Sequence, residues 1–124
     1  MSLAHRNYGA VRVLSPKGRL DHDNCDAFRA ALAPHLEACA RERQPLVLDL
    51  SGIEYVSSAG LRCLMLAAKE AGASKGRLLV AAMQPVVAEI FQISRFNLVF
   101  EVFATLREAL ASISPQAAEA FDRA

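Results

Sequence analysis

Two apolar segments, joined by a short polar loop, most constrain what this chain can fold into. Residues 46–50 (LVLDL) form a continuous apolar run after Pro45, which is typical of a central strand covered on both faces. After Ser57 and Ser58, apolar residues recur at helical spacing at Leu61, Leu64, Met65 and Ala68. The sequence therefore predicts a central strand, a tight loop and a helix that begins at hydroxyl side chains.

The serines at the start of this predicted helix suit two roles. The first N–H groups of a helix lack intrahelical partners and carry a partial positive charge, so a serine there caps the helix and an anionic group there is stabilised. Ser58 is therefore a candidate carrier of a phosphate group, and we expect it to be exposed. Local physical chemistry alone favours the simpler interpretation, in which Ser57 or Ser58 only caps the helix.

A longer motif around these serines adds to this interpretation. Residues 49–62 (DLSGIEYVSSAGLR) closely resemble the signature of the STAS domain, the fold of bacterial anti-sigma factor antagonists. Residues 18–21 (GRLD) resemble the G-x-L-D that closes the first hairpin of that family, and the resemblance covers roughly residues 8–113. In the family the regulatory serine lies two residues before the loop glycine, here Gly60, which implies phosphorylation of Ser58.

The chain departs from the family pattern at both neighbours of that serine. Ser57 stands where many members have an aspartate, and Ala59 stands where many have a second serine. Ser57 is therefore the alternative phosphorylation site.

The remaining sequence alternates strands and helices. Residues 8–20, with a turn at residues 15–18, predict an opening hairpin, and residues 77–82 and 100–103 predict further strands. Helices are expected up to residue 43, from residue 85 to 93 and from residue 105 to 113, with turns or loops at residues 71–76 and at Phe96, Leu98 and Val99. We expect a single α/β STAS domain over residues 1–124, with its core at about 8–113 and a C-terminal tail at 114–124, in which residues 116–124 add a marginal helical turn or fray. Its mixed sheet, opened by the N-terminal hairpin, should pack with about four helices.

The resemblance also implies a function. An unmodified antagonist binds an anti-sigma factor that is a serine kinase, so that the sigma factor is released, and phosphorylation ends the contact until a serine phosphatase reverses it. The implied partner-binding residues are Asp21, Asp23, Ser57, Ser58 and Arg62, although the acidic cluster at residues 21–24 is equally explained as a helix cap. The alternative within the family is an accessory subunit of an ABC-type lipid transporter that binds the ATPase subunit.

Composition and motifs argue against other classes. Fourteen Lys and Arg residues balance thirteen Asp and Glu residues without a basic stripe, so we expect no nucleic-acid partner. Val56 stands where the G-x-S-x-G motif of serine hydrolases needs glycine, and a phosphate-binding glycine loop is absent, so we expect no enzyme activity.

The three cysteines give no sign of a disulfide framework or a metal site. Cys25, Cys39 and Cys63 lie in apolar helical patterns and are expected to be reduced, buried thiols, with no metal and no cofactor. Without a membrane-length apolar run or a signal peptide pattern, we expect a cytoplasmic protein that does not insert into membranes.

Overall fold

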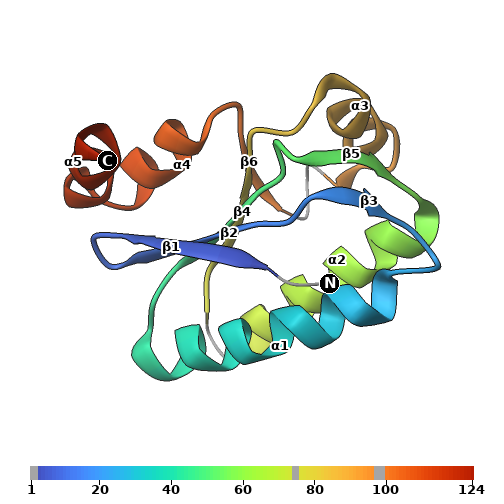
Figure 1. The fold of residues 1–124 in the computed structure, drawn as a ribbon, viewed down its shortest axis with the longest axis horizontal. Helices are drawn as coiled ribbons and strands as arrows, with labels where there is room; N and C mark the ends of the chain where they lie inside the picture. Colours follow the sequence, from blue (N-terminus) through green and yellow to red (C-terminus); the bar gives the residue numbers. More distant parts are fainter. Residues whose placement is uncertain (1–2, 74–75, 97–99) are drawn as a thin grey trace.

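The chain folds into a five-stranded mixed sheet with helices on both faces and a two-stranded sheet beside it (Figure 1). The computed structural model describes residues 3–73, 76–96 and 100–124, so the predicted loop residues Leu98 and Val99 and part of the predicted turn at 71–76 lie outside it. The elements in chain order are β1 (Ala4–Tyr8), β2 (Val11–Ser15), β3 (Gly18–Leu20), α1 (Cys25–Glu42), β4 (Leu46–Asp49), β5 (Ile53–Val56), α2 (Ser58–Ala73), β6 (Leu78–Ala81), α3 (Pro85–Ile93), β7 (Glu101–Phe103), α4 (Leu106–Ile113) and α5 (Pro115–Arg123).

The main sheet has the strand order β1-β2-β4-β6-β7. β1 and β2 are antiparallel, and the remaining neighbours are parallel. β4 is the central strand, as its apolar run predicted: Leu46 and Leu48 contribute to the core beneath α1 and α2, whereas Val47 contributes to the core beneath α4 and α5. Because helices cover both faces, every side chain of β4 before Asp49 is buried and apolar.

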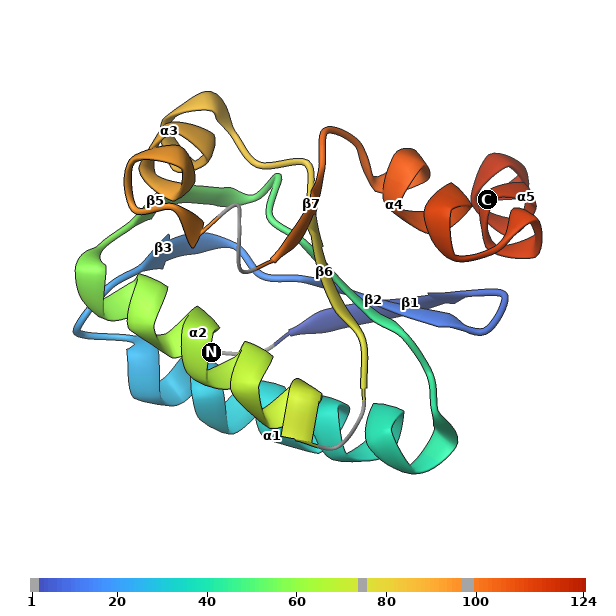
Figure 2. The same cartoon turned by 180° about the vertical axis from the view of Figure 1, so that it is seen from behind.

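The small sheet consists of β3 and β5, which pair in parallel, and α3 packs against β5. Figure 2 shows this unit from behind, at the end of the molecule where α2 begins. The sequence did not predict β5, because its four residues follow Ser51 and Gly52 and read as part of a loop. Ile53 and Val56 are buried there, while Glu54 and Tyr55 are exposed.

The predicted position of the opening hairpin was wrong. The hairpin turn lies at Gly9 and Ala10, where Gly9 adopts a φ of +59°, and it pairs Tyr8 with Val11. Residues 15–18, which were predicted to be that turn, instead carry the chain from the main sheet to β3 in the small sheet. Proline and glycine mark a change of direction, but they do not reveal which strand the chain pairs with next.

The described residues contain five helices rather than about four, because the C-terminal tail, expected to add at most a marginal helical turn, forms α5. The Ser114 hydroxyl accepts a hydrogen bond from the backbone N–H of Ala117 at 3.1 Å, and Pro115 occupies the first turn. Ala117 is fully buried, and the Phe121 ring lies 5.5 Å from that of Tyr8 on β1. These contacts with β1 stabilise α5, which would be only marginally helical on its local sequence alone.

Candidate functional site

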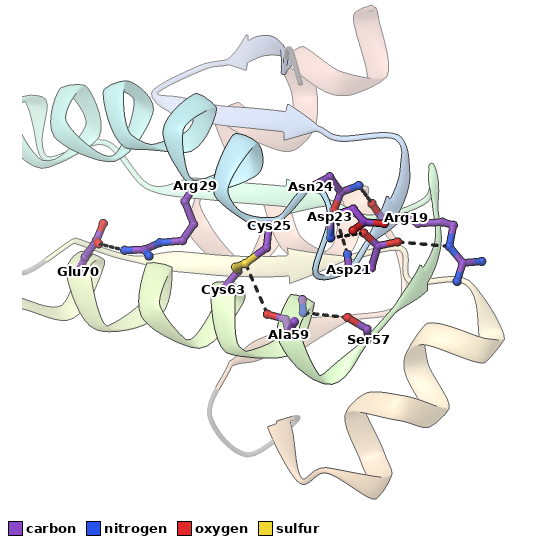
Figure 3. Close-up of a disulfide and its surroundings, with 11 residues drawn as sticks. Arg19, Asp21, Asp23, Asn24, Cys25, Arg29, Ser57, Ala59, Cys63 and Glu70 are labelled. Carbon is purple, nitrogen blue, oxygen red and sulfur yellow. Dashed lines mark hydrogen bonds and ion pairs between the residues drawn. A yellow bond between two sulfur atoms is a disulfide. The ribbon is translucent and has the colours of Figure 1, made fainter.

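The two serines at the start of α2 have different surroundings. Ser57 is half-buried: its backbone N–H donates to the Leu20 carbonyl at 2.9 Å, and its hydroxyl accepts from the backbone N–H of Gly60 at 3.2 Å (Figure 3). Ser58, the first residue of α2, is exposed, as predicted. Within residues 3–73, 76–96 and 100–124, its hydroxyl makes no hydrogen bond. Ser57 therefore caps the helix and leaves the Ser58 hydroxyl free.

Gly60 lets the first turn of α2 pass directly over the end of β3. A Cβ atom at this position would overlap the carbonyl oxygen of Leu20, the same oxygen that accepts the hydrogen bond from Ser57. Only glycine permits so close an approach between two backbones. The crossing brings the loop that follows Leu20 next to the serines.

That loop contains the predicted acidic residues. The Asp21 carboxylate accepts a hydrogen bond from the backbone N–H of Asp23 at 3.0 Å and lies 3.7 Å from the Nε atom of Arg19. Asn24 closes the loop by accepting from the Asp21 N–H at 2.9 Å and by donating to the Arg19 carbonyl. Asn24 precedes α1 but makes no side-chain cap, so these side chains order the loop and not the helix start. Asp23 is exposed, and Asp21 is half-buried.

Arg62 lies one helical turn after Ser58 and is exposed. Residues four apart on a helix are neighbours on its surface. In the part of the chain that the structure describes, the Arg62 guanidinium forms no ion pair. The structure thus groups Ser57, Ser58 and Arg62 on the start of α2, beside the loop that carries Asp21 and Asp23.

An aromatic and a basic side chain that sequence reasoning missed flank this group. The Arg19 guanidinium on β3 lies 4.7 Å from the ring centre of Tyr55 on β5. Tyr55 is 36% exposed, which is high for a large hydrophobic side chain. The alternation of buried and exposed residues in Ile53–Val56 was the available signal, but four residues are too few to distinguish a strand from a loop.

The predicted state of two cysteines was wrong. A disulfide joins Cys25, the first residue of α1, to Cys63 in α2, with 6.2 Å between their Cα atoms (Figure 3). Cys39 is free and buried, as predicted. A separation of 38 residues gives no sign of this pairing, because it depends on how α1 and α2 are placed side by side.

Other polar groups lie apart from the serines. Burial, together with the neighbouring Arg12 and His5, lowers the pKa of His35 on α1. A cavity of about 250 Å³ between α1 and α2 is bridged by the Arg29–Glu70 ion pair, and its lining includes neither serine. Among the described residues there is no group of three metal-ligating side chains and no helix long and apolar enough to cross a membrane.

The fold and this site together define a small α/β module that presents a hydroxyl group at the start of a helix. The model of the STAS domain family described as "Mlab, STAS domain" matches residues 4–102, so the chain belongs to the STAS domain family. This confirms the resemblance noted in the sequence.

Named relatives refine the comparison. The chain is 38% identical over 112 residues to a Bordetella bronchiseptica protein provisionally named anti-sigma factor antagonist BtrV, covering 90% of this chain and 93% of that protein. It is 29% identical to the anti-sigma-F factor antagonist RsfB of Mycobacterium tuberculosis, covering 86% and 84% of the two chains. The crystal structure of a Thermotoga maritima protein provisionally described as an anti-sigma factor antagonist has the same fold, with a TM-score of 0.79, 18% identity and 89% and 92% coverage.

Proposed function

We propose that this chain is an anti-sigma factor antagonist whose contact with an anti-sigma factor serine kinase is switched by phosphorylation of Ser58. In the unmodified state it binds the anti-sigma factor and so releases a sigma factor. Phosphorylation ends that contact, and a serine phosphatase restores it. The observation that carries the proposal is the Ser58 hydroxyl, which is exposed and makes no hydrogen bond to any described residue, while Ser57 caps α2.

The start of α2 is suited to hold a phosphate without unfolding. A phosphoserine carries about −1.5 to −2 charges at pH 7, and the positive end of the helix dipole stabilises negative charge at the first helical residue. The Arg62 side chain, one turn further along, is available as a partner for the phosphate oxygens. Phosphorylation should therefore leave the antagonist folded.

The effect of the phosphate should fall on the partner. Asp23 is exposed and Asp21 half-exposed on the adjacent loop, so a phosphate on Ser58 adds to negative charge already present there. A partner surface that fits the unmodified site would have to remove water from the phosphate and accept its negative charge. Both costs weaken binding. Asp21, Asp23, Ser57 and Arg62 are proposed to form the contact together with Ser58.

We propose that the chain itself performs no chemistry. Its sequence contains no phosphate-binding glycine loop and no nucleophile elbow, and the names of the relatives are those of antagonists. A separate kinase then supplies the phosphate. The proposed setting is the cytoplasm, with residues 1–124 acting as one STAS domain.

The test is mass spectrometry after incubation with ATP and candidate serine kinases encoded near this gene. Phosphate is expected on the wild-type protein and on Ser57→Ala, and is expected to be absent from Ser58→Ala. The matched control, Ser94→Ala, changes an exposed serine at the end of α3 and should be modified like the wild type. Phosphate found on Ser57 would overturn the assignment of Ser58.

A binding measurement tests the switch itself. Ser58→Glu should bind the kinase more weakly than the wild type, whereas Ser58→Ala should bind it with similar affinity, because only the first adds a negative charge next to the acidic loop at residues 21–23. Equal affinity of all three proteins would contradict the electrostatic mechanism.

The family model is described as "Mlab, STAS domain", and the resemblance to STAS domains also implies one second candidate, an accessory subunit of an ABC-type lipid transporter. In that role the start of α2 contacts the ATPase subunit, and phosphate plays no part. Stable binding to such an ATPase, together with the absence of phosphorylation by every kinase tested, would establish this alternative over the first proposal.

A further inference from the structure

The Cys25–Cys63 disulfide connects the two segments that form the proposed contact site. Cys25 follows the acidic loop directly, and its backbone N–H donates to the Asp21 carbonyl at 3.0 Å. Cys63 lies five residues after Ser58 on α2. The Cys25 sulfur also lies 3.6 Å from the carbonyl oxygen of Ala59, the residue next to Ser58 (Figure 3). The bond therefore holds the start of α1 against the first turns of α2.

We propose that this disulfide is a reversible redox switch that controls how readily Ser58 is phosphorylated. The inference rests on the proposed function, because it assigns regulation to the same serine. In the cytoplasm thiols are normally kept reduced, and disulfides that form there are usually transient. We therefore expect the bond between these two cysteines to form only under oxidising conditions and not to be a permanent crosslink.

The chemistry balances with a peroxide as oxidant. The Cys25 thiol, which is half-buried, attacks hydrogen peroxide to give a sulfenic acid and one water molecule. The buried Cys63 thiol then displaces the hydroxyl group, which forms the S–S bond and releases a second water. A dithiol reductant reverses the reaction: one of its thiolates attacks Cys25, Cys63 leaves as the thiol after taking a proton, and the second thiol releases Cys25.

The oxidised form should be the poorer kinase substrate. Two thiols occupy more space than one S–S bond, so reduction lets the start of α1 and the first turns of α2 separate. A kinase must bring the serine hydroxyl into line with the transferred phosphate, and the first turn of α2 must adjust to allow this. The disulfide opposes that adjustment. Oxidation therefore prolongs the unphosphorylated, partner-binding state.

Cys39 provides an internal control. It is buried, its thiol donates to the Gln44 side chain at 3.7 Å, and burial raises its pKa, which disfavours the reactive thiolate. Oxidation at low peroxide concentration should therefore be confined to the Cys25–Cys63 pair.

The experiment compares phosphorylation rates of the full chain after peroxide treatment and desalting, and after reduction with dithiothreitol. The oxidised wild type should be phosphorylated at least about fivefold more slowly than the reduced protein, since the crosslink opposes the adjustment of the first turn of α2. Cys39→Ser should keep this difference. Cys25→Ser and Cys63→Ala should react at the reduced rate under both conditions, and circular dichroism of each variant checks that it is folded. Equal rates for the two wild-type forms, or a difference that persists in both cysteine variants, would overturn the proposal.

A second readout does not depend on any kinase. Hydrogen exchange of the backbone amides of Gly60 and Leu61, which donate to the Ser57 hydroxyl and carbonyl, should be at least about tenfold slower in the oxidised protein, because the crosslink suppresses local opening. Exchange that is unchanged by reduction would refute the switch even where phosphorylation is observed. If the reduced protein is not phosphorylated by any kinase but the exchange rates differ, the proposed function fails and the redox-controlled opening of α2 stands.

Discussion

Substituting each serine at the start of α2 in turn tests the division of roles between them. Ser57→Ala removes the hydroxyl that accepts from Gly60, a residue that is itself buried. Loss of an N-cap costs about 0.5–2 kcal/mol, and the buried N–H left without a partner places this case in the upper half of that range. Ser58→Ala removes a hydroxyl that makes no hydrogen bond in the described structure, and alanine is the better helix former.

The expected difference is large enough to measure by thermal unfolding. With an unfolding entropy of about 2.1 cal/mol/K per residue, a destabilisation of 1 kcal/mol lowers the Tm of a chain of 124 residues by about 4 °C. Ser57→Ala should therefore lower the Tm by about 4–8 °C, whereas Ser58→Ala should change it by less than about 2 °C.

Circular dichroism melts and urea titrations, all in reductant, provide the assay. Ser57→Asp is the matched control: aspartate is also a good N-cap, so this variant should keep a Tm near that of the wild type. A larger loss from Ser58→Ala than from Ser57→Ala would refute the assignment of the cap to Ser57.

Three further predictions concern stability. Gly60→Ala should cost about 2–3 kcal/mol in urea unfolding, because its Cβ overlaps a backbone oxygen that cannot easily move; a cost below about 0.5 kcal/mol would contradict this. Because the pKa of His35 lies below its ordinary value of 6.5, the unfolded chain binds more protons as the pH falls below 6.5, and stability declines there. His35→Gln should flatten this decline between pH 7.5 and 5, and an unchanged slope would assign it to other groups. Reducing the Cys25–Cys63 bond should lower the free energy of unfolding by about 4 kcal/mol, the entropy of closing a loop of 38 residues. Adding reductant to Cys63→Ala, which cannot form the bond, should change nothing, and a comparable loss there would rule out this bond as the cause.

The parts of the fold that follow from local pattern were predictable. The apolar run of β4 indicated a covered strand, and the spacing of apolar residues in α2 predicted its buried face. The partner of β3 was not predictable, because three residues carry too little pattern to select one sheet over another. The helix at α5 depends on buried contacts of Ala117 with the rest of the molecule, which no local signal encodes.

For the site, the sequence predicted an exposed Ser58 at a helix start but left open which of the two serines caps that helix. Both are serines, and only the backbone path shows that the Ser57 hydroxyl reaches the N–H of Gly60. The disulfide was unpredictable for a related reason. Two cysteines on different helices become neighbours only through the packing of α1 on α2, and sequence spacing carries no information about that packing.

The edges of the main sheet bear on how this protein behaves when it is concentrated. An edge strand exposes unpaired backbone groups to which a second copy can add a strand, the first step of many aggregates. Here one edge, β1, presents the exposed side chains of His5, Arg6 and Asn7, and the other, β7, has only three residues. The Arg6 guanidinium on one edge disfavours pairing with its own copy, and a very short edge offers few hydrogen bonds. The chain should therefore resist self-association through its strands and remain available to exchange one partner for another.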